Sequence, residues 1–352
     1  PKTTTPPCAI LTTELYRFSS VSTIQSAQHV CERGSRMELA MLGMIFLAGI
    51  ILIVKGGDWF VDAASWIAEV SGIPKLIVGA TIVSLATTLP ELLVSVMAAS
   101  QGKADMAVGN AVGSVTANLG LIMAISVICM PVRIRRGDYF LKSVLMLSAA
   151  GLLVWGGGKG GVGPALSLPL AGIFAVFTYE NLRGARRAMR YGGELGPVRE
   201  PPRKRAVLFQ CLKFTLGAAA VMLGADLLVD SGSALARLAG ISERIIGVTI
   251  VAIGTSLPEL VTTVTAIVKK QSALSVGNIL GANILDLTMI LPVSALVSGQ
   301  ALPVSTASAR IDIPACLLVG AIAVIPAMVT ARFRRWQGFA LLAVYGGYVA
   351  LT

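Results

Sequence analysis

The sequence predicts an all-α polytopic membrane protein, with ten transmembrane helices arranged as two inverted five-helix repeats. Three observations predict this fold class. The 352 residues are 55% hydrophobic and only 13% charged, with a mean hydropathy of +0.79. Stretches of about 20 mostly apolar residues, long enough to cross a bilayer, follow one another with short polar breaks. The segment ATTLPELLVS at 86–95 recurs as GTSLPELVTT at 254–263.

The chain begins with a segment unlike the rest. Residues 1–36 are polar and rich in Ser and Thr, and they contain neither a long apolar run nor a cleavage site after one. They are therefore not a convincing signal peptide. We expect a polar N-terminal tail without a transport role, with a functional N-terminal module as the alternative. Met37 opens the first strongly apolar run.

Charged and Gly/Pro-rich breaks divide the remaining chain into ten expected helices. The first and sixth are long enough to require a strong tilt. We expect a first five-helix repeat at 37–182, a basic cytoplasmic loop at 183–206 and a second, inverted repeat at 207–352. The expected helices lie near 38–68, 76–99, 105–130, 139–156, 163–182, 207–236, 244–268, 273–298, 311–330 and 336–351.

Lys and Arg residues collect after the odd-numbered spans. Lys75, the group at 133–136, the loop from Arg183 to Arg205, the pair at 269–270 and the group at 332–335 follow spans 1, 3, 5, 7 and 9. Cytoplasmic loops carry such an excess, so both ends of the ten-span core are predicted outside. The net charge of +11 falls in these loops, and we expect no nucleic-acid partner. We interpret the basic loop at 183–206 as a solvated linker, with a regulatory or lipid-binding role as the alternative.

The two copies align without a gap at an offset of 168 residues. Residues 79–119 and 247–287 are identical at 16 of 41 positions, which indicates duplication. Because each copy holds five spans, the second must enter the membrane in the opposite sense. Inverted repeats place substrate and coupling ions near the midplane, on broken helices.

Each copy carries a proline and a carboxylate inside an apolar run. Pro90 and Pro258 have no N–H group, so each should leave a backbone carbonyl without its helical partner. Glu91 and Glu259 follow directly. A carboxylate within the bilayer is costly and indicates a functional site, and two equivalent copies make a purely structural role a weak alternative.

Further oxygen atoms surround these carboxylates in the predicted helices. Ser114 and Asn118 share one face of the following span, and Ala282 and Asp286 are their equivalents. Such an all-oxygen set, with several carboxylates and no His or Cys, favours hard cations and Ca²⁺ over Mg²⁺. Asn110 is expected to cap or bend the start of its helix, as is Asn278 in the second copy. The hydroxyl groups beside the two glutamates are Thr87, Thr88, Thr255 and Ser256.

Other function classes find little support. The single histidine, His29, lies in the N-terminal segment, and there is no catalytic GxSxG, so an intramembrane enzyme is disfavoured. Five cysteines without a CxxC give no metal knuckle. A channel is disfavoured because three carboxylates should hold a cation too tightly for free conduction. Asp58, Asp62 and their equivalents Asp226 and Asp230 are open to interfacial, helix-pairing or ion-contact roles.

The paired GxTIVxxxTxLPEL and GNxxG motifs resemble the alpha-repeats of the cation/calcium exchanger superfamily, specifically its prokaryotic sodium/calcium exchanger branch. The resemblance covers Met37 to Thr352. It implies a secondary active antiporter that exchanges Ca²⁺ for Na⁺ by alternating access, in the plasma (inner) membrane of a prokaryote. Its partners would be the two ions and the lipid bilayer, with no cofactor, and a monomer is expected to suffice for transport. Proton- or potassium-coupled exchange is the alternative.

The resemblance also implies roles for individual residues. Glu91 and Glu259 would be the central Ca²⁺ ligands shared with Na⁺, with Asn118 and Asp286 completing a diamond-shaped ion cluster. Three departures are Ala86 for Gly, Thr88 for Ser, and Ala282 for a Ser opposite Ser114; the last puts one outer Na⁺ site in doubt. Proton-coupled relatives typically carry Glu where this chain has Gly113 and Gly281, which favours sodium. The Na⁺-coordinating groups would be Thr87, Thr88, Thr255, Ser256 and Ser114, with backbone carbonyls near Ser84 and Ala252.

Overall fold

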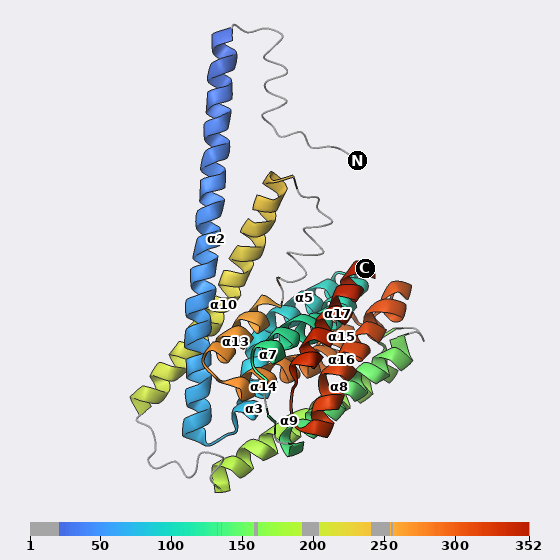
Figure 1. The fold of residues 1–352 in the computed structure, drawn as a ribbon. Helices are drawn as coiled ribbons and strands as arrows, with labels where there is room; N and C mark the ends of the chain where they lie inside the picture. Colours follow the sequence, from blue (N-terminus) through green and yellow to red (C-terminus); the bar gives the residue numbers. More distant parts are fainter. Residues whose placement is uncertain are drawn as a thin grey trace.

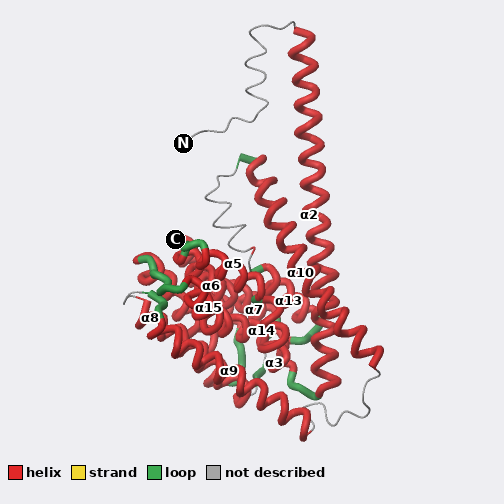
Figure 2. Tube along the Cα trace, turned by 180° about the vertical axis from the view of Figure 1, so that it is seen from behind, coloured by secondary structure: helices red, strands yellow, loops and turns green. Residues whose placement is uncertain are grey.

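The computed structural model describes residues 21–131, 133–134, 136–157, 161–191, 204–240, 254 and 256–351. Apart from two isolated backbone bridges, the regular structure of these residues is helical. Figures 1 and 2 show two long helices beside a bundle formed by the others. The predicted all-α, multi-span fold is confirmed.

Several of the transmembrane segments consist of α-helical pieces joined by wider π-helical turns, labelled η. Such turns are uncommon and occur frequently at functional sites. In chain order the helices are α2 (Val21–Ser71), α3 (Lys75–Val78), η1 (Gly79–Val83), α4 (Ser84–Thr87), α5 (Leu89–Ser100), α6 (Ala104–Ala117), η2 (Asn118–Met123), α7 (Ala124–Cys129), α8 (Arg136–Gly157), α9 (Pro164–Tyr191), α10 (Lys204–Leu238), α13 (Leu257–Val268), α14 (Ser272–Leu285), η4 (Asp286–Ile290), α15 (Leu291–Ser298), η5 (Ser308–Asp312), α16 (Ile313–Thr330) and α17 (Arg335–Leu351).

Each of the ten expected spans contains helix where the structure describes it. Within the part of the chain that the structure describes, seven helices are long and apolar enough to cross a membrane, and the bent pair Lys75–Thr87 and Leu89–Ser100 makes an eighth. Of the expected span 244–268, the described part includes α13. Helix ends differ from the expected limits: α2 already begins at Val21, and α9 continues to Tyr191.

The internal repeat is visible in the helix boundaries. The bounds of α5 and α13 begin 168 residues apart, and those of α6 and α14 agree at both ends with the same offset. The turns η2 and η4 begin at the equivalent residues Asn118 and Asp286. Three backbone hydrogen bonds between described residues join the repeats: Ile134 N donates to Ala331 O at 3.0 Å, Val162 N to Leu302 O at 2.8 Å, and Leu302 N to Val162 O at 3.1 Å. Ile134 and Leu302 are equivalent positions, and their acceptors Ala331 and Val162 differ from exact equivalence by one residue, because Ala331 corresponds to Gly163.

Helices α2 and α10 pack together at the edge of the bundle (Figure 1). Glycines allow their backbones to approach closely. A Cβ atom on Gly56 would lie 2.9 Å from Gly217 O, and one on Gly217 would lie 2.9 Å from Gly56 O. Gly49 and Gly224 form a second such contact, with a Cβ on Gly224 lying 2.8 Å from Gly49 O. The helices therefore cross in antiparallel fashion, and each glycine contact is the other's equivalent in the repeat.

Helices α6 and α14 form the centre of the molecule. In the most apolar stretch of Ala104–Cys129, 72% of residues are buried, and in that of Ser272–Ser298, 78%. The corresponding share is 11% in both α2 and α10. The two central segments therefore carry their polar residues into protein, while α2 and α10 present mostly apolar surface to lipid.

Candidate ion-binding site between the repeats

The repeated motif forms a helix break in the first copy. The chain bends by 46° between Lys75–Thr87 and Leu89–Ser100, at Thr88. Pro90 lies in the first turn of α5, where its missing N–H group is tolerated. In the second copy Pro258 lies in the first turn of α13, after Ser256. The prediction of a broken helix at this motif is confirmed for the first copy.

Three carboxylates are buried at the repeat interface. Glu91 lies in the first turn of α5, Glu259 in the first turn of α13, and Asp286 at the start of η4; each is 1% exposed. The negative charges of Glu259 and Asp286 act on Glu91 by electrostatic repulsion. Burying carboxylates together costs much free energy unless positive charge compensates them. A cation is the ligand that this arrangement favours.

Hydrogen bonding leaves most of these oxygen atoms available. Both carboxylate oxygens of Glu91 and both of Asp286 are buried with no hydrogen-bond partner among the described residues. Glu259 Oε2 is in the same state, whereas Glu259 Oε1 accepts from the Thr88 hydroxyl at 3.5 Å. Buried acceptors without partners are rare in folded proteins. Their concentration here indicates a site built to hold ions.

Three neutral side chains of the predicted ligand set also bury oxygen atoms without partners among the described residues. Ser114 Oγ, Asn118 Oδ1 and Ser256 Oγ are buried, and none has a partner within the part of the chain that the structure describes. Asn118 begins η2 just as Asp286 begins η4. The oxygen atoms of Ser114, Asn118 and Ser256 therefore resemble most of the carboxylate oxygens in being buried without hydrogen-bond partners among the described residues, and their role as ion ligands stays a prediction.

Three of the predicted ligand groups, Thr87, Thr88 and the carbonyl of Ser84, already take part in hydrogen bonds. Thr87 donates to Asn278 Oδ1 at 3.3 Å and to Ser84 O at 3.3 Å. Ser84 O also accepts from the Thr88 N–H at 2.9 Å. The single hydroxyl hydrogen of Thr87 is shared between its two acceptors, so Thr87 and the carbonyl of Ser84 have protein partners, unlike the side-chain oxygens of Ser114, Asn118 and Ser256 within the described residues. Thr255 and Ala252, the corresponding candidates of the second repeat, lie outside the described residues.

No three Asp, Glu, His or Cys side chains of the described segments converge on a single point that could hold a metal ion. An ion here would therefore be shared between fewer carboxylates and the neutral oxygens. Ca²⁺ accepts such mixed sets of carboxylate, amide and hydroxyl oxygens, because its coordination is flexible. The residues present suit a hard cation as cargo.

Asn278, Thr262, Asn110 and Ser95 form hydrogen bonds beside the site residues that the sequence analysis did not predict. Asn278 lies in the middle of α14, where its Nδ2 donates to Thr262 Oγ1 at 3.0 Å and its Oδ1 accepts from Thr87. Asn110, inside α6, donates to Glu91 O at 3.1 Å and to Ser95 Oγ at 2.9 Å. The expectation that both asparagines cap or bend a helix start is wrong. Their recurrence in both copies was the signal for a structural role.

Asn283 was also not predicted as a site residue. Its side chain is fully buried on α14, next to Ala282, and neither amide atom has a partner among the described residues. Its equivalent in the first repeat is Val115. Because the sequence analysis relied on matches between the copies, a polar residue present in only one of them was overlooked.

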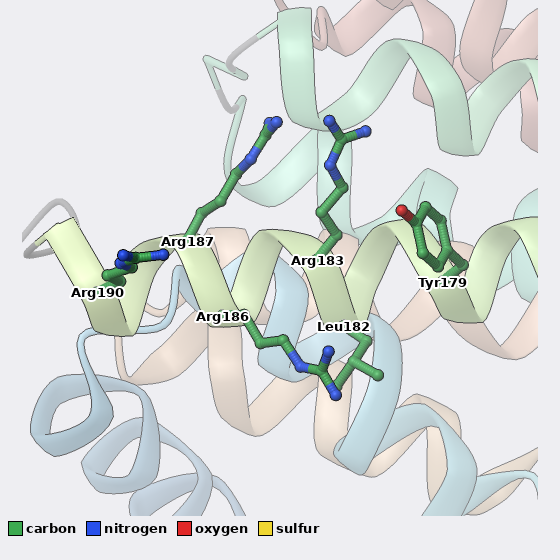
Figure 3. A pocket seen from close by; sticks show the side chains of 6 residues that line it. All are labelled: Tyr179, Leu182, Arg183, Arg186, Arg187 and Arg190. Carbon is green, nitrogen blue, oxygen red and sulfur yellow. The ribbon is translucent and has the colours of Figure 1, made fainter.

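A separate cavity has the wrong charge for a cation. It measures about 290 Å³ and lies on the C-terminal half of α9. Figure 3 shows arginine side chains leaving this helix in different directions. Positive groups repel cations, so the buried carboxylate site is the candidate for ion binding. The lining residues are Tyr179, Leu182, Arg183, Arg186, Arg187 and Arg190.

The chain resembles known proteins along most of its length. The model of the family described as sodium/calcium exchanger protein matches residues 41–182 and 210–352. The inner membrane protein YrbG of Escherichia coli is 32% identical over 257 residues, 72% of this chain and 79% of that protein. The sodium/calcium exchanger MaX1 of Methanosarcina acetivorans is 28% identical over 346 residues, 88% of this chain and 97% of that protein.

A solved structure has the same fold. It is that of the sodium-calcium exchanger NCX_Mj soaked with Na⁺ and Sr²⁺, which superposes with a TM-score of 0.75 at 26% identity. The match covers 89% of this chain and 99% of that one. Both halves of the chain that carry the buried carboxylates thus lie within the compared regions.

Proposed function

Because this chain belongs to the sodium/calcium exchanger protein family, we propose that it is a secondary active antiporter that exchanges Ca²⁺ for Na⁺ by alternating access. Family membership makes it a multi-pass membrane transporter rather than an enzyme, and implies no cofactor. The observation that carries the proposal is the set of buried carboxylate oxygens contributed by both repeats, most of them without a hydrogen-bond partner among the described residues.

Shared ligands explain how one ion flow drives the other. Glu91 and Glu259 come from different repeats, so a cation bound between them links the two halves of the molecule. Without a cation, the buried negative charges oppose the conformational change because they would have to cross a low-dielectric region. The protein then changes conformation readily only when Ca²⁺ or several Na⁺ neutralise the site, which couples the two fluxes.

The moving parts are assigned to α2 and α10. They face lipid, pack on each other through glycines, and lie at the edge of the bundle that holds the site. A pair with few buried residues can shift across the core with little loss of packing. In this mechanism the shift opens Glu91 and Glu259 to one side of the membrane or to the other.

Sodium is favoured over protons as the coupling ion by the site's composition. Asn118 offers an amide, and Ser114 and Ser256 offer hydroxyls, which are neutral oxygens that Na⁺ accepts and that do not titrate near neutral pH. A proton-driven exchanger would rely on its carboxylates alone. Potassium involvement is distinguished by the experiment below.

The test is uptake of ⁴⁵Ca²⁺ into proteoliposomes that contain the purified full chain. An outward Na⁺ gradient should drive uptake, and equal K⁺ or choline gradients should not. Uptake driven by a pH gradient in the absence of Na⁺ would point to proton coupling, and a requirement for external K⁺ would point to co-transport of K⁺ with Ca²⁺. Ca²⁺ equilibration without any counter-ion would contradict an exchanger.

A further inference from the structure

Four charged side chains join α2 to α10 and to the end of α13. Lys269 Nζ lies 2.6 Å from Asp62 Oδ1 and 3.2 Å from Asp58 Oδ1. Lys269 also donates to the backbone oxygen of Asp58 at 3.0 Å. Lys213 Nζ, on α10, lies 3.0 Å from Asp62 Oδ2. We call Asp58, Asp62 and Lys269 the Asp62 bridge; Lys213 binds the other carboxylate oxygen of Asp62 from α10 and lies outside the bridge.

The Asp62 bridge spans the contact between α2 and α13. A Cβ on Gly57 of α2 would lie 2.9 Å from Val261 Cγ1 and 2.9 Å from Thr265 Oγ1, so the two helices touch there. Glu259 lies ten residues before Lys269, which corresponds to about 15 Å along a helix axis. The bridge therefore ties α2 to α13 at the end of the helix that leads from Glu259 to the face that carries Lys269.

The opposite end of α10 has the same carboxylates without the lysines. Asp58 and Asp62 correspond to Asp226 and Asp230, but Lys269 corresponds to Gln101 and Lys213 to Ile45. Asp226 lies thirteen residues beyond Lys213, about 20 Å along α10. A cavity of about 250 Å³ opens there, lined by Asp226 and Asp230 together with Pro90, Val94, Met222, Ala225, Val229, Gly254 and Pro258. Among the described residues the two ends thus differ: ion pairs tie α2 to α13 at one end, and a cavity lies beside Asp226 and Asp230 at the other.

We propose that the Asp62 bridge is a latch that holds α2 against α13 and closes the Lys269 face while the opposite face is open. The proposal deepens the antiport function proposed above, since it assigns the contact that must break in each transport cycle. The distribution of basic residues predicts that the Lys269 face is cytoplasmic.

The exposure of the latch suits a reversible switch. The side chains of Lys269, Asp58 and Asp62 are 24%, 43% and 45% exposed. Ion pairs with this exposure are weakened by water and by salt, so the latch shifts the conformational equilibrium about fivefold rather than trapping one state. Lys213 binds Asp62 within the α2–α10 pair, which moves as a unit, and so does not contribute to that shift.

The test measures how accessible the α2–α13 contact is. In the full chain with its native cysteines replaced, Val261→Cys places a thiol against Gly57. Its rate of reaction with a charged thiol reagent is measured in lipid nanodiscs. Lys269→Gln should raise the rate about fivefold, and Lys269→Arg should restore it. Two matched controls should keep the parent rate: Lys213→Gln, and Lys270→Gln, which removes the same charge from the neighbouring residue.

A salt series on the protein with Lys269 intact gives a second measurement that requires no latch variant. Raising choline chloride to about 1 M should increase the labelling rate of the parent, because salt screens exposed charges, and should leave Lys269→Gln unchanged. The latch is refuted if neither Lys269→Gln nor added salt changes the labelling rate. It is also refuted if Lys269→Gln, Lys213→Gln and Lys270→Gln all raise that rate equally. Labelling does not require transport, so a failed latch with intact ⁴⁵Ca²⁺ exchange refutes the latch alone. Intact latch behaviour without exchange refutes the antiport proposal.

Discussion

The Thr88 hydroxyl of the first repeat donates a hydrogen bond to Glu259 Oε1 of the second repeat, at 3.5 Å. The equivalent pair, Ser256 and Glu91, does not form this bond: Ser256 Oγ and both Glu91 oxygens are buried without a partner among the described residues. The two halves of the site therefore differ although the motif repeats. Glu259 is anchored across the interface, and Glu91 depends more strongly on a cation for compensation.

The carboxylates give the first prediction. Glu91→Gln and Glu259→Gln should each reduce Na⁺-dependent ⁴⁵Ca²⁺ uptake to background, because an amide keeps the shape of the side chain and removes its charge. In the absence of Na⁺ and Ca²⁺, Glu91→Gln should raise the midpoint of thermal unfolding more than Glu259→Gln, since it removes the less compensated charge. The control is Glu180→Gln, at a surface ion pair with Arg183. Near-normal uptake by both site variants would refute the assignment.

Position 282 tests the missing hydroxyl. Ala282 is fully buried at the position equivalent to Ser114. Ala282→Ser should lower the Na⁺ concentration for half-maximal exchange about fivefold, because one neutral oxygen contributes on the order of 1 kcal/mol. Ser114→Ala should raise it. Ca²⁺ affinity should change less in both variants, since carboxylates dominate Ca²⁺ binding. Equal shifts for the two ions, or none, would mean that position 282 faces helix packing; Ala323→Ser, at another buried alanine, is the control.

The glycine crossing of α2 and α10 predicts a packing effect. A Cβ on Gly56 would lie 2.8 Å from Ala220 Cβ and 2.9 Å from Gly217 O, so Gly56→Ala forces the helices apart. We expect a loss of about 1–3 kcal/mol in unfolding free energy, typical of overpacking. Thermal unfolding in detergent measures it. Gly43→Ala on the same helix has no atom within 4 Å of the new Cβ; similar behaviour of the two variants would contradict the close crossing.

The inverted topology predicts opposite labelling of two equivalent turns. The short turns after α5 and α13 both contain a residue with positive φ, Gly102 at 73° and Lys270 at 57°. In a cysteine-free background, Lys103→Cys should react with an impermeant reagent from outside the cell, and Lys270→Cys only from the cytoplasmic side. Reaction of both from the same side would show that the repeats are not inverted.

How much of this could be predicted from the sequence depends on the range of the interactions. Hydrophobic runs and basic loops are local features, and they predicted the helical segments in all ten places where the structure describes them. The duplicated Pro-Glu motif predicted the break at Thr88 and the burial of Glu91 and Glu259. A proline disrupts a helix wherever it stands, and a carboxylate in an apolar run must be buried or solvated, so these consequences need no knowledge of distant residues.

Contacts between distant residues were decided by the tertiary structure. The pairing of Thr88 with Glu259 joins residues 171 positions apart, and that of Thr87 with Asn278 joins residues 191 apart. Two similar copies predict symmetric sites, yet single differences such as Val115 for Asn283 or Gln101 for Lys269 make the two sides unequal. Which hydroxyl reaches which carboxylate, and which carboxylate meets a lysine, depends on the angles and distances between packed helices. Local sequence fixes the chemistry of each side chain, and the packing of both repeats selects its partner.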